Sequence, residues 1–223
     1  MNLDKIVSLL APHICIACGS EGAVMGQSCL ASAGDLIPSR CAGCHKITTD
    51  YKTCPACLKW LRARHVYVAT SYDSLYERLL HELKFECRKE AVYPIAAIMH
   101  QQLQSVSHYD LLCPLPTAPA RIRLRGFDHT LLIARLLSKK SRIPIARVLT
   151  RSSNIRQVGA NRQQRLTQLE NEFRTNEKSS VQGKNVLIID DITTTGASIA
   201  TAANGLYKAG AKSVSALVYA QKI

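Results

Sequence analysis

The stretch Val186-Leu187-Ile188-Ile189-Asp190-Asp191-Ile192-Thr193-Thr194-Thr195-Gly196-Ala197-Ser198 decides the fold of this chain. Its first four residues form a continuous apolar run, which is typical of a strand buried on both faces of a parallel sheet. Two aspartates follow at the carboxyl end of the strand, where open α/β sheets bind their ligands. Apolar residues from Ile199 to Leu206 then recur with helical spacing. The stretch therefore predicts a strand, a ligand-binding loop and a helix of an α/β protein.

The residues between this strand and this helix suit a phosphate group. Three threonines precede Gly196, and the loop opens directly into the first helical turn, so backbone N–H groups and the positive helix end can face an anion. Asp190 and Asp191 would repel a phosphate but can accept hydrogen bonds from the vicinal hydroxyls of a ribose. Alone, an Asp-Asp pair is equally typical of a metal pair or a helix cap. A Walker A loop is excluded because the stretch holds no Gly-Lys-Ser/Thr.

The segments on either side alternate between strand-like and helix-like patterns from Val66 onward. Strands are expected at Val66–Tyr72, Asp110–Leu115, Ala146–Leu149 and Val214–Tyr219, and helices over Leu75–Leu83, Glu90–Leu103, Phe127–Leu137 and the polar segment 161–173. This alternation favours an open, mostly parallel sheet with helices on both faces.

Seven of the nine cysteines lie before residue 58. The pairs Cys41-x-x-Cys44 and Cys54-x-x-Cys57 have the spacing of a structural zinc ribbon, in which two tight turns each supply two thiolates to a tetrahedral ion. Scattered buried thiols are the alternative. The first 60 residues show too little hydrophobic periodicity to bury a core alone, so they need a metal site of this kind to hold them together. We therefore expect a zinc-ribbon module over residues 1–62 and a second domain over residues 63–223.

An earlier, incomplete cysteine set precedes this ribbon. Cys15, Cys18 and Cys29 match a second zinc ribbon whose fourth position is Ser32. His13, His45 or a water molecule could complete the site, and a lapsed metal site is the equally weighted alternative.

The charge of the chain is strongly positive and unevenly distributed. The net charge is +13, and residues 121–165 hold twelve basic residues, ten of them arginine, against one aspartate. A guanidinium matches pyrophosphate or nucleic-acid phosphate geometrically, although a solvated basic face is the simpler interpretation. The sequence has no apolar run long enough to cross a bilayer and no signal-peptide pattern, which predicts a cytoplasmic protein.

Two resemblances follow from these motifs. The segment from Asp190 to Ser198 resembles the phosphoribosyl pyrophosphate (PRPP) motif of type I phosphoribosyltransferases. Nearly the whole chain resembles the ComF-type competence proteins, which combine a double zinc ribbon with a phosphoribosyltransferase-like domain. The motifs that carry this resemblance are the Cys-x-x-Cys ribbon, His81–Phe85, Arg121–Asp128, the spaced Gln157, Arg165 and Phe173, and Asp190–Ser198.

The resemblance implies a type I phosphoribosyltransferase-like parallel sheet and a role in DNA uptake during natural transformation. It implies PRPP binding with Mg²⁺, with Asp190 and Asp191 as catalytic residues and a nitrogenous base or amine as the most plausible, unidentified acceptor. The implied PRPP-binding residues are Lys84, Pro116, Thr117, Arg121, Arg125, Asp190, Asp191, Thr193, Thr194, Thr195, Gly196, Ala197 and Ser198. The alternative is a DNA-binding or scaffold protein of the competence machinery that contacts single-stranded DNA and partner proteins and uses PRPP only as a regulatory ligand.

The sequence departs from the ComF pattern at a few positions. Ser32 replaces a cysteine, and Asp128-His129 replaces the usual Asn-Gln after Gly-Phe. Ala160 and Gln168 replace a usual Leu and Asn. The first departure concerns one zinc site, and none touches the loop from Asp190 to Ser198.

Overall fold

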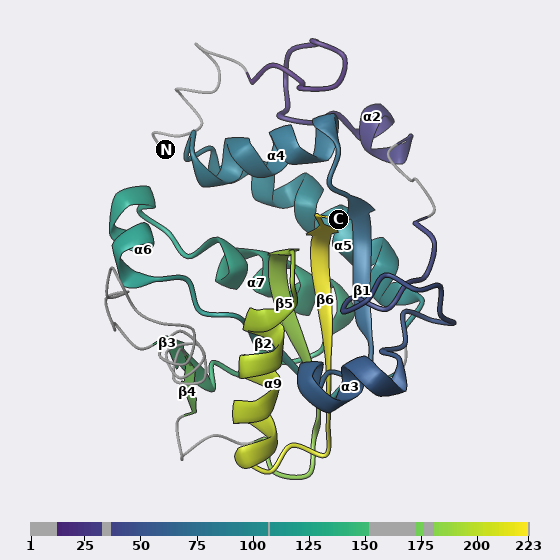
Figure 1. The fold of residues 1–223 in the computed structure, drawn as a ribbon. Helices are drawn as coiled ribbons and strands as arrows, with labels where there is room; N and C mark the ends of the chain where they lie inside the picture. The colour runs from purple at the N-terminus through teal and green to yellow at the C-terminus, as the bar shows by residue number, and fades with distance from the viewer. Residues whose placement is uncertain (1–12, 33–36, 107, 152–172, 176–180, 223) are drawn as a thin grey trace, which may run out of the picture.

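The computed structural model describes residues 13–32, 37–106, 108–151, 173–175 and 181–222 (Figure 1). In chain order its elements are α2 (Gln27–Ala31), α3 (Pro55–Leu61), β1 (Val66–Ser71), α4 (Ser74–Lys84), the 3₁₀ helix η1 (Lys89–Ala91), α5 (Val92–Gln104), β2 (Leu111–Pro114), α6 (Pro119–Arg125), α7 (His129–Ser141), β3 (Leu149–Arg151), β4 (Phe173–Thr175), β5 (Asn185–Thr193), α9 (Ala197–Lys208) and β6 (Ser213–Gln221).

The centre of the fold is a four-stranded parallel sheet in the order β1-β6-β5-β2. Strand β5 pairs with β6 from Asn185 to Thr193, whereas its register with β2 ends at Pro114 opposite Ile189. Strands β3 and β4 form a separate antiparallel pair. Every residue of β6 is buried, as expected for a central strand that is covered on both faces.

Helices cover both faces of this sheet. Figure 1 shows α3 and α9 in front of the strands and α5 and α7 behind them. Alternate residues of β5 follow this division: Leu187 and Ile189 pack in one core with α4, α5 and α7, and Val186 and Ile188 pack in the other with α3 and α9. The expected fold class, a parallel α/β sheet with helices on both faces, is confirmed.

Several element boundaries differ from the expectations. Helix α6 was not expected, although Pro119 at its first position and Gly126 after its last turn are typical start and stop signals of a helix. The strand expected at Ala146–Leu149 is instead β3, which begins at Leu149; upstream of it, Ile145 forms an isolated bridge with Leu112. Phe173 lies in β4, not at the end of a helix; residues 161–172 and the motif residues Gln157 and Arg165 lie outside the described residues.

The cysteine-rich segment folds against the sheet. Ala42 and Leu61 pack in the same core as Val66 of β1. A boundary at residue 62 or 63 therefore stays a prediction. Within the described part of the chain, no helix is both long and apolar enough to span a membrane.

Candidate functional site

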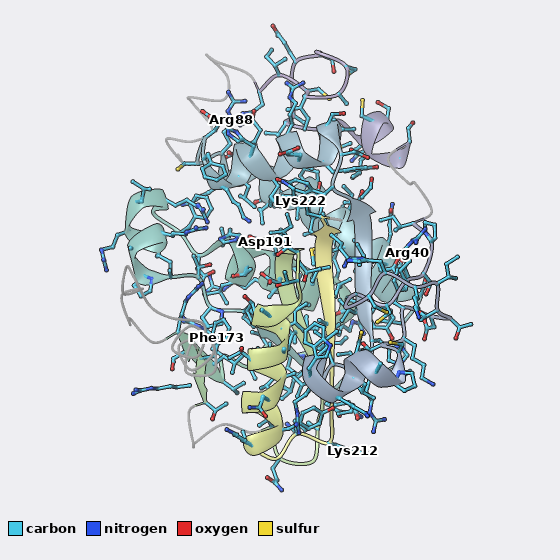
Figure 2. All side chains as sticks on the ribbon, in the orientation of Figure 1. Arg40, Arg88, Phe173, Asp191, Lys212 and Lys222 are labelled. Carbon is cyan, nitrogen blue, oxygen red and sulfur yellow. The ribbon has the colours of Figure 1, made fainter. Side chains whose placement is uncertain are left out.

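The candidate site lies at the carboxyl edge of the sheet, where the segments after β2 and β5 are neighbours. The Leu115 N–H donates to the Ile189 carbonyl at 2.9 Å, and β2 ends there while β5 continues beside β6. Asp190 and Asp191 therefore lie on β5 just beyond the end of β2. Figure 2 shows Asp191 near the upper end of β5.

Asp191 is the centre of a buried polar network. Its carboxylate accepts from Lys84 Nζ at 2.7 Å and contacts His129 Nε2, and the side chains of all three residues are about nine-tenths buried. These partners hold the pKa of Asp191 well below its usual value, although burial alone would raise it. Asp191 is therefore ionised, and Lys84 has a buried counter-ion.

Arg125 extends this network and fixes the tautomer of His129. Its Nη1 donates to His129 Nδ1 at 2.6 Å, and its Nε donates to the Lys84 carbonyl at 2.9 Å. Because a guanidinium only donates, Nδ1 must accept, so the proton of a neutral ring is on Nε2 and points to Asp191. Two cations, Lys84 and Arg125, thus lie around Asp191 and His129, and a second carboxylate, Asp128, is joined to His129 through the hydroxyl of Thr117. Paired lysine and arginine side chains of this kind suit an anionic ligand.

Asp190 has the opposite electrostatic behaviour. Successive strand residues face opposite sides of a sheet, so its side chain is directed away from the network around Asp191. Burial, followed by the charge of Asp191, raises its pKa to about 8 from a usual value of 3.8. One oxygen of Asp190 accepts from the Asp191 N–H at 2.8 Å. Near pH 7 this carboxyl is mostly protonated, so it can donate as well as accept a hydrogen bond.

The segment after β2 is held by hydroxyl groups. Thr117 Oγ1 donates to Asp128 Oδ1 at 2.9 Å, and Thr130 Oγ1 donates to the Leu115 carbonyl at 2.7 Å. The carboxylate of Asp128 also accepts from the Leu131 N–H and caps α7. This arrangement fixes the backbone of residues 115–117 beside the end of β5.

The loop after β5 joins the strand directly to α9. Gly196 is the N-terminal capping residue of α9 with φ 75°, a left-handed conformation that favours glycine. Thr194 and Thr195 are exposed, whereas Thr193 is buried. The loop therefore presents two hydroxyl side chains and the positive end of a twelve-residue helix at the sheet edge.

The structure joins four of the sequence-predicted site residues in one network. Lys84, Arg125 and Asp191 are in direct contact, and Thr117 lies next to them through a 3.3 Å contact with His129 Nδ1. Arg121, in contrast, is exposed in the first turn of α6.

His129 is a site residue that the sequence analysis did not identify. It was noted only as a departure from the ComF pattern, yet it bridges Arg125 and Asp191. Arg125, the last residue of α6, lies four residues upstream, but Asp191 is 62 residues away. The one sequence signal for this bridging role is the place of His129 directly after the capping residue Asp128.

The four-cysteine cluster matches a structural zinc site. Ligand atoms of Cys41, Cys44, Cys54 and Cys57 all lie within 4.8 Å of one another, and the Sγ atoms of Cys44 and Cys54 are 3.6 Å apart. A zinc tetrahedron with Zn–S bonds of about 2.3 Å needs thiolates about 3.8 Å apart. The Cys54 N–H also points to the Cys41 Sγ at 3.4 Å. These residues could therefore hold Zn²⁺.

The three remaining N-terminal cysteines also gather. Cys15, Cys18 and Cys29 satisfy the same 4.8 Å criterion, and among the described residues no fourth Cys, His, Asp or Glu joins them. Ser32 is exposed, and its hydroxyl donates to the Ser28 carbonyl. This cluster supplies three of the four ligands that a structural zinc ion takes.

Comparisons with protein families and with curated proteins each found a match to this chain. Residues 128–223 match the family described as "Phosphoribosyl transferase domain". The chain is 27% identical over 193 residues to the competence protein ComFC of Bacillus subtilis strain 168, which covers 82% of this chain and 78% of ComFC.

Two solved structures are similar to part of this chain. One is an allosteric regulatory enzyme of purine biosynthesis, with a TM-score of 0.42, 18% identity and coverage of 59% of this chain. The other is the glutamine PRPP amidotransferase of B. subtilis in complex with ADP and GMP, with a TM-score of 0.39, 18% identity and coverage of 56% of this chain. The matched region is 25% of the length of each of these proteins.

Proposed function

We propose that this chain, of which residues 128–223 match a phosphoribosyl transferase domain and which is similar to the competence protein ComFC, binds PRPP with Mg²⁺ at the carboxyl edge of β5. The observation that carries this proposal is the gathering of two largely buried cations, Lys84 and Arg125, around the Asp191–His129 pair, on the strand that leads into a glycine-capped helix. An anionic ligand would give these cations a further counter-charge.

The two phosphate-bearing ends of PRPP would occupy different loops. The 5′-phosphate would accept hydrogen bonds from the loop Thr193–Ser198 at the positive end of α9. The pyrophosphate would lie along Pro116 and Thr117, near the cations of Lys84 and Arg125, with Arg121 reaching it from α6. This assignment uses the predicted ligand residues of both loops.

The ribose would lie between these two ends. As the resemblance to the PRPP motif implies, Asp190 and Asp191 would hold its vicinal hydroxyls, each from its own face of β5, with Asp190 able to donate or accept. Mg²⁺ takes oxygen ligands: it usually keeps several water molecules and is bound through one or two carboxylates together with substrate phosphates. The carboxylates of this site and the ligand oxygens fit that preference, and the ion would neutralise charge as pyrophosphate leaves.

A role in DNA handling during natural transformation is the second candidate, and the basic surface favours it. Helices α6 and α7 and the segment after them expose basic residues that form no salt bridge within the described part of the chain: Arg121, Arg123, Arg135, Lys139, Lys140, Arg142 and Arg147. Binding of single-stranded DNA that weakens steeply with salt and competes with PRPP would support this candidate.

Thermal unfolding with a panel of ligands tests the primary proposal. We expect PRPP with Mg²⁺ to raise the melting temperature more than ribose 5-phosphate or pyrophosphate alone, because each fragment reaches only one end of the site. At a hundredfold excess over Kd, binding adds about 2.7 kcal/mol to the free energy of unfolding. If PRPP gives no shift at saturating concentration, the proposal is wrong. If PRPP does bind, pyrophosphate release with a panel of bases and amines would separate an enzyme from a binding protein.

A further inference from the structure

Helix α3 links the four-cysteine cluster to the loop after β5. Cys54 is its N-terminal capping residue and Cys57 lies in its first turn, while Trp60 and Leu61 form its last turn. A helix of seven residues is not stable alone. Its position therefore depends on what holds its two ends.

The first turn of the cluster packs directly on Trp60. A Cβ atom at Gly43 would lie 2.7 Å from the ring atom Cζ2 of Trp60 and 2.9 Å from Cys57 Sγ. Only a residue without a side chain allows this approach. The indole ring is therefore seated against the turn Cys41–Cys44.

The same helix packs on the glycine of the phosphate loop. A Cβ atom at Gly196 would lie 2.8 Å from Cδ1 of Leu61 and 3.6 Å from Cη2 of Trp60. Leu61 is fully buried, and Trp60 retains 44% exposure. The loop Thr193–Ser198 is thus packed against α3 at Gly196.

Other contacts hold this segment to the sheet. Gln221, the last residue of β6, donates from Nε2 to the Ala42 carbonyl at 3.2 Å. The guanidinium of Arg62 lies 5.8 Å from the ring centroid of Tyr207 in α9. The cluster is therefore attached both to the carboxyl edge of the sheet and to the helix that begins at the loop.

We propose that α3 couples the four-cysteine metal site to the phosphate loop, so that metal loading and PRPP binding strengthen each other, with Trp60 and Leu61 as positioning residues. This inference rests on the proposed function of the loop. Metal bound by Cys54 and Cys57 fixes the start of α3, and its end then holds Gly196 in the left-handed conformation that begins α9. Loss of the metal releases the start of α3, and the loop then loses its packing against Trp60 and Leu61.

Calorimetric titration of the full zinc-loaded chain with PRPP and Mg²⁺ tests the coupling. We expect Trp60→Ala to weaken PRPP binding about tenfold, within the usual range of coupling between sites, and Trp60→Phe to restore most of the affinity. The matched control is Leu58→Ala, which removes an exposed apolar side chain from the same helix without reaching either glycine, and should leave Kd unchanged. Equal affinities of Trp60→Ala, zinc-chelated and wild-type protein would overturn the proposal.

Reciprocity supplies a second readout. By linkage, PRPP must raise the zinc affinity by the same factor by which zinc raises the PRPP affinity, as measured by competition with a chromophoric chelator. Trp60 is also the single tryptophan of the chain, so its fluorescence reports on the contact itself.

Hydrogen exchange separates this inference from the proposed function. If the wild type binds no PRPP, the function is wrong, but faster exchange of the amides 193–198 after zinc removal or Trp60→Ala would still support the coupling. Unchanged exchange in both would refute it. Thermal unfolding of each variant verifies that the sheet remains folded.

Discussion

Asp190 and Asp191 are adjacent in β5 and have opposite pKa shifts because they face different sides of the sheet. Burial dominates at Asp190 and raises its pKa to about 8. Lys84 and His129 compensate burial at Asp191 and lower its pKa. The sequence predicted both residues as ligand-binding carboxylates, but it could not separate their roles, since the partners of Asp191 come from α4 and α7.

The shift of Asp190 predicts how its neutral variant behaves with pH. The folded protein holds this proton up to about pH 8, whereas an unfolded chain releases it near 3.8, so this group lowers stability as pH rises between those values. Asp190→Asn removes the titration. The melting temperature of Asp190→Asn relative to wild type should therefore rise from pH 4 to pH 8 and then level off. Parallel melting curves across this range would contradict the assigned shift.

His129 predicts a difference between two substitutions. His129→Leu removes one buried hydrogen-bond partner from Asp191 and one from Arg125, which keep their contacts with Lys84, and this should cost about 1–3 kcal/mol per group in urea unfolding. His129→Gln retains one acceptor and one donor, and we expect it to cost clearly less. Equal losses for both variants would show that the ring acts by packing alone.

At the scale of elements, local patterns predicted the strands and helices whose residues are buried on regular faces. The strands expected at Val66–Tyr72 and Val214–Tyr219 correspond to β1 and β6. Strand β5 extends through Asp190 and Asp191 because β6 pairs with it as far as Thr193, a tertiary effect that apolar periodicity does not reveal. Helix α6 was missed because its arginine-rich sequence has no apolar stripe.

A comparison of two glycines, one before β5 and one in the loop before α9, separates the cost of backbone strain from the cost of close packing. Gly196 and Gly183 both have left-handed φ angles, of 75° and 70°, but a Cβ atom at Gly183 meets nothing within 4 Å. Gly183→Ala should therefore cost about 1–2 kcal/mol from strain alone. Gly196→Ala should cost about 1–3 kcal/mol more from overpacking against Leu61, and it should abolish PRPP binding. Equal unfolding free energies of the two variants would contradict the close packing of α3 on the loop.

At the scale of the whole molecule, the chain carries a net charge of +13, and part of the positive charge is built into the site. Lys84 and Arg125 are buried beside Asp191, whereas the other described basic residues of α6 and α7 are exposed. Charge counting along the sequence pointed to residues 121–165, which include Arg125 but not Lys84, and it could not distinguish buried from exposed basic residues. Burial makes that distinction, because only a buried cation demands a nearby anion.

The most direct measurement of the central claim is a calorimetric titration of PRPP with Mg²⁺ into the wild type and Thr194→Asp. Thr194 is exposed in the loop, so the substitution should leave the fold intact while placing a negative charge where the 5′-phosphate would bind. Thr49→Asp, at an exposed threonine of the cysteine-rich segment, is the matched control. We predict saturable binding to the wild type and to Thr49→Asp, and loss of binding in Thr194→Asp. Absence of binding to the wild type, or equal binding to all three proteins, would contradict the claim.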